Sequence, residues 1–215
     1  MDMDAGSLSL QLKDKGLFKQ KCFINGKWVD SDSGDTFEVF NPSDLTLVGT
    51  MPNSTKTETI KAIEAANNSW NGWKKLSGKD RSIIIRRWHE LILENIDDLA
   101  LIMTLENGKP IADARGEIIY ATWFTDWFAE EAKRTYGKTI PSTNASNRIM
   151  TIKQPIGVCG IITPWNFPAA MITRKVAPAL AAGCPVIIKP AGTTPFSATA
   201  LVELADRAGV PKGVI

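Results

Sequence analysis

PIGVCGIITPWNFPAAMITRKVAPALAAGCPVIIKPAGTTP, from Pro155 to Pro195, is the stretch that decides how this chain folds. An apolar run over 156–162 predicts a buried strand, and a similar run over 185–189 predicts a second one. Between them the sequence predicts a helix over 169–182, closed by Gly183. Strand, helix and strand in this order form a βαβ unit, which implies a parallel sheet covered by helices and a right-handed crossover.

The ends of these two strands mark the place where a ligand is expected. Ligands of parallel sheets bind outside the carboxyl ends of the strands. In this chain those ends carry Trp165, Asn166, Lys189 and Ala191. We therefore look for function at this edge of the sheet.

The composition is that of a soluble globular protein, with 44% hydrophobic and 22% charged residues in a chain of 215. The net charge of +2 gives no indication of a nucleic-acid or membrane-surface partner. Cys22, Cys159 and Cys184 show neither metal nor disulfide spacing, which indicates a reducing compartment. Because the chain shows no membrane-spanning run and no targeting pattern, we expect a cytoplasmic location.

The chain ahead of the βαβ unit predicts a β region and then helices. Asn25-Gly26 between short apolar runs predicts a hairpin within a small antiparallel region over 18–52. Thr55 followed by Glu58 is a capping box, which predicts the start of the first helix. Apolar residues that recur every three or four positions predict further helices over 80–107, 112–136 and, after the βαβ unit, 197–207.

Three polar residues of the βαβ unit have both a functional and a structural interpretation. Asn166 can donate to a developing oxyanion, but Asn is also typical of a helix N-cap, and Pro168 suits the first turn. The Lys189 ammonium fits a ribose or a phosphate, or it simply extends from a strand end along apolar surface. Arg174, in an apolar helix that Pro178 should kink, needs either a substrate carboxylate or a structural one.

The sequence contains no complete catalytic set. Cys159 lies in an apolar strand and Cys184 follows a helix C-terminus, and both settings disfavour a thiolate. The only histidine, His89, lies beside an apolar helix stripe. Asp97-Asp98 and Glu130-Glu131 are interpreted as solvated helix faces. Neither a G-x-G-x-x-G nor a P-loop motif occurs.

Several longer motifs resemble the aldehyde dehydrogenase superfamily. They are ITPWNFP at 162–168, its spacing to Lys189-Pro190-Ala191, and LENGKP at 105–110. GVCGIITPWNFPAAMITRK and KPAGTTPFSATALVELADRAGVPKGV are similar to the succinate-semialdehyde dehydrogenase branch. The resemblance extends from about Phe18 to the last residue.

The resemblance implies a role for each matching residue. Asn166 matches the side-chain donor of the oxyanion hole, Arg174 matches the arginine that holds the far carboxylate, and Lys175 matches a lysine near the catalytic pocket. The implied cofactor-binding residues are Thr163, Pro164, Trp165, Lys189, Ala191 and Gly192. The implied reaction is thiolate attack on the aldehyde, hydride transfer to a nicotinamide and hydrolysis of the thioester.

Two departures from the family pattern matter. Many members have a glutamate where this chain has Gly192, and that carboxylate binds the ribose diol. Without it nothing repels a 2′-phosphate, so NAD or NADP is expected as the cofactor. The nucleophilic cysteine and the general-base glutamate correspond to positions beyond Ile215, and none of Cys22, Cys159 and Cys184 matches the nucleophile.

The implied fold is α/β: an incomplete Rossmann-like cofactor-binding domain with parallel βαβ units, an N-terminal β-hairpin region and a helical segment. The catalytic domain is expected to be absent. The expected segments are a flexible N-terminus (1–17), hairpins and helices of the cofactor-binding domain (18–138), a bridging and oligomerisation segment (139–155), and a truncated βαβ dinucleotide-binding core (156–215).

The implied function is NAD(P)-dependent oxidation of succinate semialdehyde to succinate, as in 4-aminobutyrate degradation, with the chain as the N-terminal part of the enzyme. The alternative is a non-catalytic cofactor-binding or interaction module. We expect a small aldehyde as substrate, no metal, no nucleic-acid or membrane partner, and a homo-oligomer for the full-length protein. The isolated chain is expected to be inactive, because the nucleophilic cysteine and the general-base glutamate are missing. It is also expected to be poorly soluble, because an open sheet edge exposes apolar surface.

Overall fold

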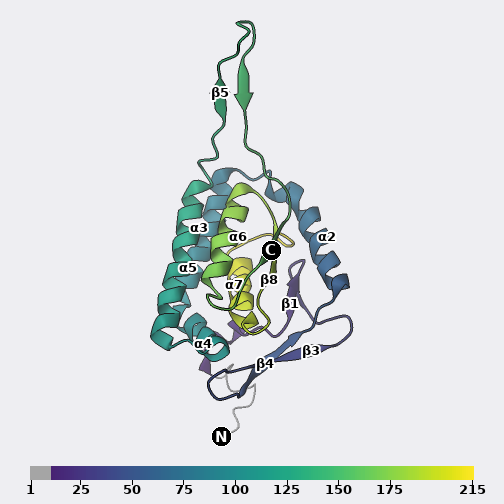
Figure 1. Cartoon of the computed structure of the whole chain (residues 1–215), viewed down its shortest axis with the longest axis vertical. Helices are drawn as coiled ribbons and strands as arrows, with labels where there is room; N and C mark the ends of the chain where they lie inside the picture. The colour runs from purple at the N-terminus through teal and green to yellow at the C-terminus, as the bar shows by residue number, and fades with distance from the viewer. Residues whose placement is uncertain (1–10) are drawn as a thin grey trace.

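Figure 1 shows the computed structural model, which describes residues 11–215. A body of packed helices carries a small β region at one end and a projecting hairpin at the other (Figure 1). The helices of this part of the chain are η1 (Lys15–Leu17, a 3-10 helix), α2 (Lys56–Trp73), α3 (Gly78–Glu94), α4 (Ile96–Asn107), α5 (Ile111–Glu131), α6 (Ala170–Ala182) and α7 (Pro195–Arg207).

The predicted βαβ unit is confirmed. Strands β7 (Cys159–Ile162) and β8 (Val186–Lys189) pair in parallel, and α6 connects them. Gly183 ends α6 in the left-handed conformation, with φ 89°, where a side chain would be strained. The Val186 amide donates to the carbonyl of Val214 at 2.8 Å, so the last apolar residues lie next to β8.

The prediction that the whole run 156–162 is buried was wrong at both ends. Ile161 is buried, but Ile156 is 88% exposed and Ile162 is 75% exposed. Strand β7 has only β8 as a partner among the described residues, so part of its surface has no covering layer. In the described residues this sheet consists of two strands.

The N-terminal β region follows the turn residues of the sequence. Strands β1 (Cys22–Ile24) and β2 (Lys27–Val29) form the predicted hairpin. Its turn residues Asn25 and Gly26 both have positive φ, 53° and 73°, as a tight hairpin turn requires. A second antiparallel pair, β3 (Thr36–Phe40) and β4 (Leu47–Pro52), follows.

The predicted flexible N-terminus was too long. Residues 1–10 lie outside the described part of the chain, but Leu12 and Leu17 are buried in the core. The Asp98 carboxylate accepts the backbone amides of Lys13 and Asp14 at 3.0 and 2.8 Å. Asp98 is also buried, so its interpretation as part of a solvated helix face was wrong.

The helix predicted over 80–107 is two helices. Asn95 ends α3, and its side-chain amide donates back to the carbonyl of Leu91 at 2.8 Å. Because the apolar stripe continues across Asn95, with Ile92 and Leu99 both buried, periodicity alone did not indicate the break. The helix predicted over 112–136 is α5, which ends earlier than predicted, at Glu131.

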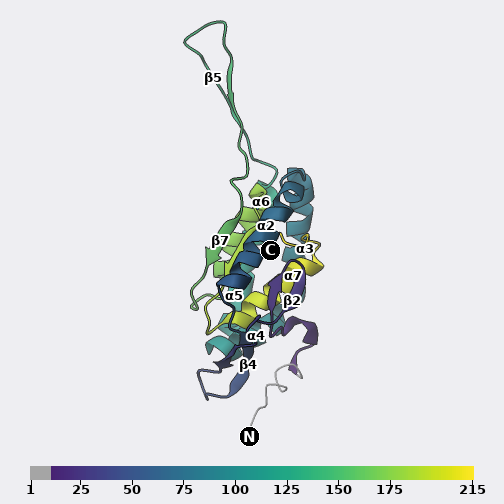
Figure 2. The ribbon, with the colours of Figure 1, turned by 90° about the vertical axis from the view of Figure 1, so that its right-hand side faces the viewer.

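The segment predicted to bridge subunits forms most of the projecting hairpin. Strands β5 (Lys138–Ile140) and β6 (Ile149–Thr151) pair antiparallel and extend away from the helices (Figures 1 and 2). Every residue of both strands is exposed. None of the helices between residues 11 and 215 combines the length and the hydrophobicity that a membrane span requires.

Candidate functional site

The candidate site is the loop between β7 and α6, together with the ends of β7 and β8. The buried Thr163 donates its amide to the carbonyl of Lys189 at 3.2 Å, which ties the two strand ends together. Pro164, Trp165 and Asn166 follow and are exposed. The structure therefore brings the sequence-predicted strand-end residues to one edge, as the βαβ topology requires.

Asn166 is not the N-cap of α6. The N-cap residue is Ala169, and it makes no side-chain capping bond. Instead Glu117 of α5 accepts the amides of Ala169 and Ala170 through Oε1, at 2.9 and 3.2 Å. The Asn166 side chain forms no hydrogen bond with any described residue, so its amide is available to a ligand.

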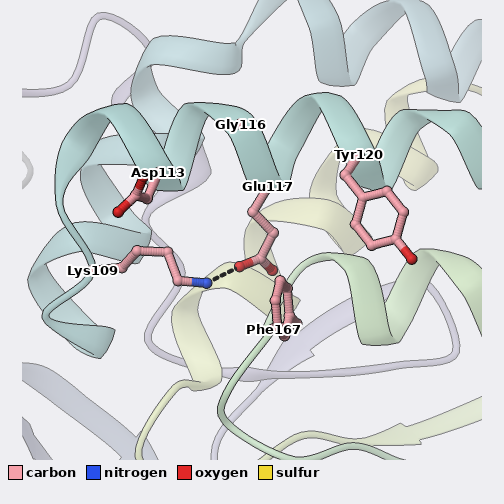
Figure 3. A pocket seen from close by; sticks show the side chains of 6 residues that line it. All are labelled: Lys109, Asp113, Gly116, Glu117, Tyr120 and Phe167. Atoms are coloured by element: carbon pink, nitrogen blue, oxygen red, sulfur yellow. Dashed lines mark hydrogen bonds and ion pairs between the residues drawn. The ribbon is translucent and has the colours of Figure 1, made fainter.

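Asn107, the last residue of α4, and Lys109, two positions further on, hold the loop through its carbonyls. Asn107 Nδ2 donates to the carbonyl of Trp165 at 2.9 Å, and Lys109 Nζ donates to the carbonyl of Asn166 at 3.2 Å. Lys109 also pairs with Glu117 Oε2 (Figure 3). The LENGKP motif in the sequence contains Asn107 and Lys109, but no sequence signal identified Glu117.

A pocket of about 420 Å³ opens beside this ion pair (Figure 3). Most of its lining comes from one side of α5, and the Phe167 ring of the loop lies across from that helix. The lining residues are Lys109, Asp113, Gly116, Glu117, Tyr120 and Phe167.

Tyr120 connects this pocket to Arg174 of α6. Arg174 Nη2 donates to the Tyr120 hydroxyl at 3.1 Å, and the guanidinium carbon lies 4.9 Å from the centre of the Phe124 ring. Arg174 is half-buried and forms no ion pair with residues 11–215. The structural carboxylate that the sequence left open as its partner is therefore not found in this part of the chain.

The remaining predicted residues differ in their surroundings. Lys175 Nζ donates to the carbonyl of Met171 at 3.3 Å, one turn earlier in α6. Lys189 is exposed, and its ammonium has only a long contact of 3.5 Å to the carbonyl of Pro190. Ala191 is half-buried and Gly192 is exposed. A free ammonium beside an open backbone suits the hydroxyl and phosphate groups of a nucleotide.

The cysteines have the properties of structural residues. Burial raises the pKa of the Cys159 thiol, and the neighbouring Cys184 raises it further. Burial also raises the pKa of Cys22, and Cys184 is buried after the C-terminus of α6. The described residues contain no cluster of side chains that suits a metal.

A second buried glutamate supports the neighbouring helix. Glu106 accepts the amides of Phe196 and Ser197 at the start of α7, both at 2.7 Å. Burial raises the pKa of Glu106 to about 7, while the hydrogen bonds to Ser197 and Phe196 act in the opposite direction. Glu106 and Glu117 thus fix the first turns of the two helices that flank β8.

Comparison with known proteins defines the class of this chain. Residues 28–215 match the aldehyde dehydrogenase family, and the chain belongs to that family. Its fold agrees: a crystal structure of an NADP-dependent enzyme of Escherichia coli superposes with a TM-score of 0.94 at 55% identity. That superposition covers 95% of this chain and 42% of the other.

Among its relatives are two enzymes named for particular semialdehydes. A glutarate-semialdehyde dehydrogenase of Pseudomonas putida is 58% identical over 206 residues, covering 96% of this chain and 43% of the relative. A succinate-semialdehyde dehydrogenase (NADP(+)) of Escherichia coli is 55% identical over 205 residues, covering 95% and 42%. The chain therefore spans less than half the length of these relatives.

Proposed function

We propose that this chain provides the cofactor-binding part, and one side of the substrate site, of an NAD(P)-dependent semialdehyde dehydrogenase. Its proposed substrate is an aldehyde with a distal carboxylate, succinate semialdehyde, which the whole enzyme would oxidise to succinate in 4-aminobutyrate degradation. The observation that carries this proposal is the half-buried Arg174 guanidinium, which has aromatic neighbours and no acidic partner in residues 11–215.

Arg174 fits the carboxylate end of such a substrate. A guanidinium recognises a carboxylate through two parallel hydrogen bonds, and an unpaired charge that is partly removed from water favours an anionic ligand. The glutarate and succinate semialdehydes named for the two relatives both carry a carboxylate at the far end. They differ by one methylene, so Arg174 alone selects the anion and not the chain length.

Asn166 fits the aldehyde end. Its amide is exposed at the mouth of the loop and has no internal partner, so it can donate to the oxygen that becomes negative during thiolate attack. In this proposal the attacking thiolate and the general base come from outside residues 1–215.

Thr163, Pro164, Trp165, Lys189, Ala191 and Gly192 would hold the nicotinamide cofactor. Lys189 supplies a cation for a ribose or phosphate oxygen, and the exposed Gly192 leaves room beside it. When bound, this cofactor accepts the hydride. The names of the related E. coli proteins specify NADP, which agrees with the absence of a carboxylate at Gly192.

Replacing Arg174 by alanine in the full-length enzyme tests the substrate assignment. Loss of a charged contact that the bound substrate buries should cost about 2–5 kcal/mol in kcat/KM for succinate semialdehyde, with little change for acetaldehyde, which has no carboxylate. Arg87→Ala, which removes an exposed arginine paired with Glu90 and Glu94, is the matched control. An equal loss with both aldehydes would contradict the proposed role.

A further inference from the structure

The loop that carries Asn166 leads into α6, and no side chain of this loop caps the start of that helix. Its carbonyls at Trp165 and Asn166 are held by Asn107 and Lys109, which lie just two positions apart in the sequence. The Lys109 ammonium also lies 4.4 Å from the centre of the Phe167 ring. Three consecutive loop residues are therefore fixed by residues at the C-terminal end of α4 and just beyond it.

Lys109 is fixed in turn by a buried carboxylate. The Glu117 side chain is 1% exposed and that of Lys109 is 17% exposed, so their ion pair is largely removed from water. Figure 3 shows the two side chains meeting at the pocket wall. Because Glu117 also accepts the first amides of α6, a single carboxylate joins Lys109 to the helix that begins at the end of this loop.

The Asn166 side chain takes no part in this network, although its backbone does. A donor that stabilises an oxyanion works because it is already in place when charge develops, and small displacements weaken it strongly. The position of the Asn166 amide therefore depends on groups that hold its own backbone and that of its neighbours. Those groups are Lys109 and Asn107.

We propose that Lys109, assisted by Asn107, is a positioning residue for oxyanion stabilisation by Asn166. This inference rests on the proposed function, in which Asn166 is the donor. Lys109 acts through the Asn166 carbonyl and contacts no reacting atom. Its loss should therefore lower kcat through Asn166, and only through Asn166.

A double-mutant cycle in the full-length enzyme tests this dependence, using Lys109→Met, Asn166→Ala and the double variant. Asn166→Ala should lower kcat about 10²–10³-fold. Lys109→Met should lower kcat at least about tenfold when Asn166 is present, and less than about twofold when it is absent. KM for the cofactor should stay unchanged in all of them. Equal losses in the two backgrounds would overturn the inference and leave the proposed function intact.

Asn107→Ala provides a second cycle in which no buried charge loses its partner, so the test stays decisive if Lys109→Met does not fold. Asn107→Ala should lower kcat when Asn166 is present and have little effect on kcat when Asn166 is replaced by alanine. An equal loss of kcat in both backgrounds would overturn the assisting role of Asn107. Lys61→Met, which removes an exposed pair with Asp32, is the matched lysine control and should leave kcat unchanged. Full activity of Asn166→Ala alone would overturn both the inference and the oxyanion role.

Discussion

At the scale of single residues, the surroundings decide between interpretations that the sequence leaves open. Asn166 was a candidate N-cap until the structure placed the cap at Ala169 and its hydrogen bonds at Glu117. Arg174 was a candidate for a structural ion pair until its neighbours proved to be Tyr120 and Phe124. Both answers depend on α5, which is distant in sequence, and local patterns therefore cannot provide them.

Gly192 gives a residue-scale test of cofactor choice. A Cβ at this position would meet only Phe37 Cε2, at 3.8 Å, so Gly192→Glu should be accommodated without steric cost. The new carboxylate would repel a 2′-phosphate, and we expect KM for NADP to rise about tenfold or more relative to KM for NAD. Steady-state kinetics with both cofactors checks this, with Gly192→Gln as the uncharged control. A parallel change for NAD and NADP would contradict it.

At the scale of elements, local signals were sufficient where the partners are close in sequence. The Thr55–Glu58 capping box, the Asn25-Gly26 hairpin and the βαβ unit were all predicted and are all present. By contrast, α6 and α7 have no local side-chain cap and depend on Glu117 and Glu106 from other helices. The break at Asn95 was missed because neither glycine nor proline marks it and the apolar stripe continues.

The capping box should make stability depend on acid pH. Hydrogen bonds from the Thr55 hydroxyl and then from the Asp32 amide lower the pKa of Glu58 from 4.5 to about 2. A lowered carboxylate pKa stabilises the folded state above pH 4.5, and that contribution is lost as the pH falls towards 2. Glu58→Gln should therefore lower Tm at neutral pH, and the difference from the parent should shrink in acid.

Thermal unfolding followed by circular dichroism between about pH 7 and pH 3 measures this difference. Glu64→Gln, on an exposed position of the same helix, is the control. A difference in Tm that stays constant over this range would show that Glu58 does not contribute through its charge.

At the scale of the whole molecule, the β5–β6 hairpin leaves apolar side chains exposed to solvent. Met150 is 72% exposed and Ile152 is 68% exposed, and the hairpin projects from the body (Figure 2). Exposed apolar side chains on a projecting arm are typical of a protein–protein contact. The predicted bridging role and the homo-oligomer remain predictions.

Replacing Met150 and Ile152 together by lysine tests that role. Because both side chains are exposed, the change should leave the Tm of the subunit nearly unchanged while it shifts the full-length protein towards smaller species. Size-exclusion chromatography with light scattering measures the shift. Thr139→Lys, on the same hairpin, controls for charge, and an unaltered mass in the double variant would exclude the arm from the interface.

The chain by itself should show no turnover. Its cysteines are structural, and none of them matches the family's nucleophile. Purified 215-residue protein should therefore produce no NADPH from succinate semialdehyde, as measured by absorbance in the presence of NADP. Measurable production would require a nucleophile within the chain and would contradict the proposed division of roles.

The most direct test of the account is a crystal structure of the full-length enzyme soaked with succinate semialdehyde. We predict that the substrate carboxylate lies about 3 Å from the Arg174 guanidinium, while the aldehyde end faces the Asn166 amide. A carboxylate bound elsewhere, with Arg174 still in contact with Tyr120, Phe124 and Met171, would contradict the central claim that this chain selects the anionic end of a semialdehyde.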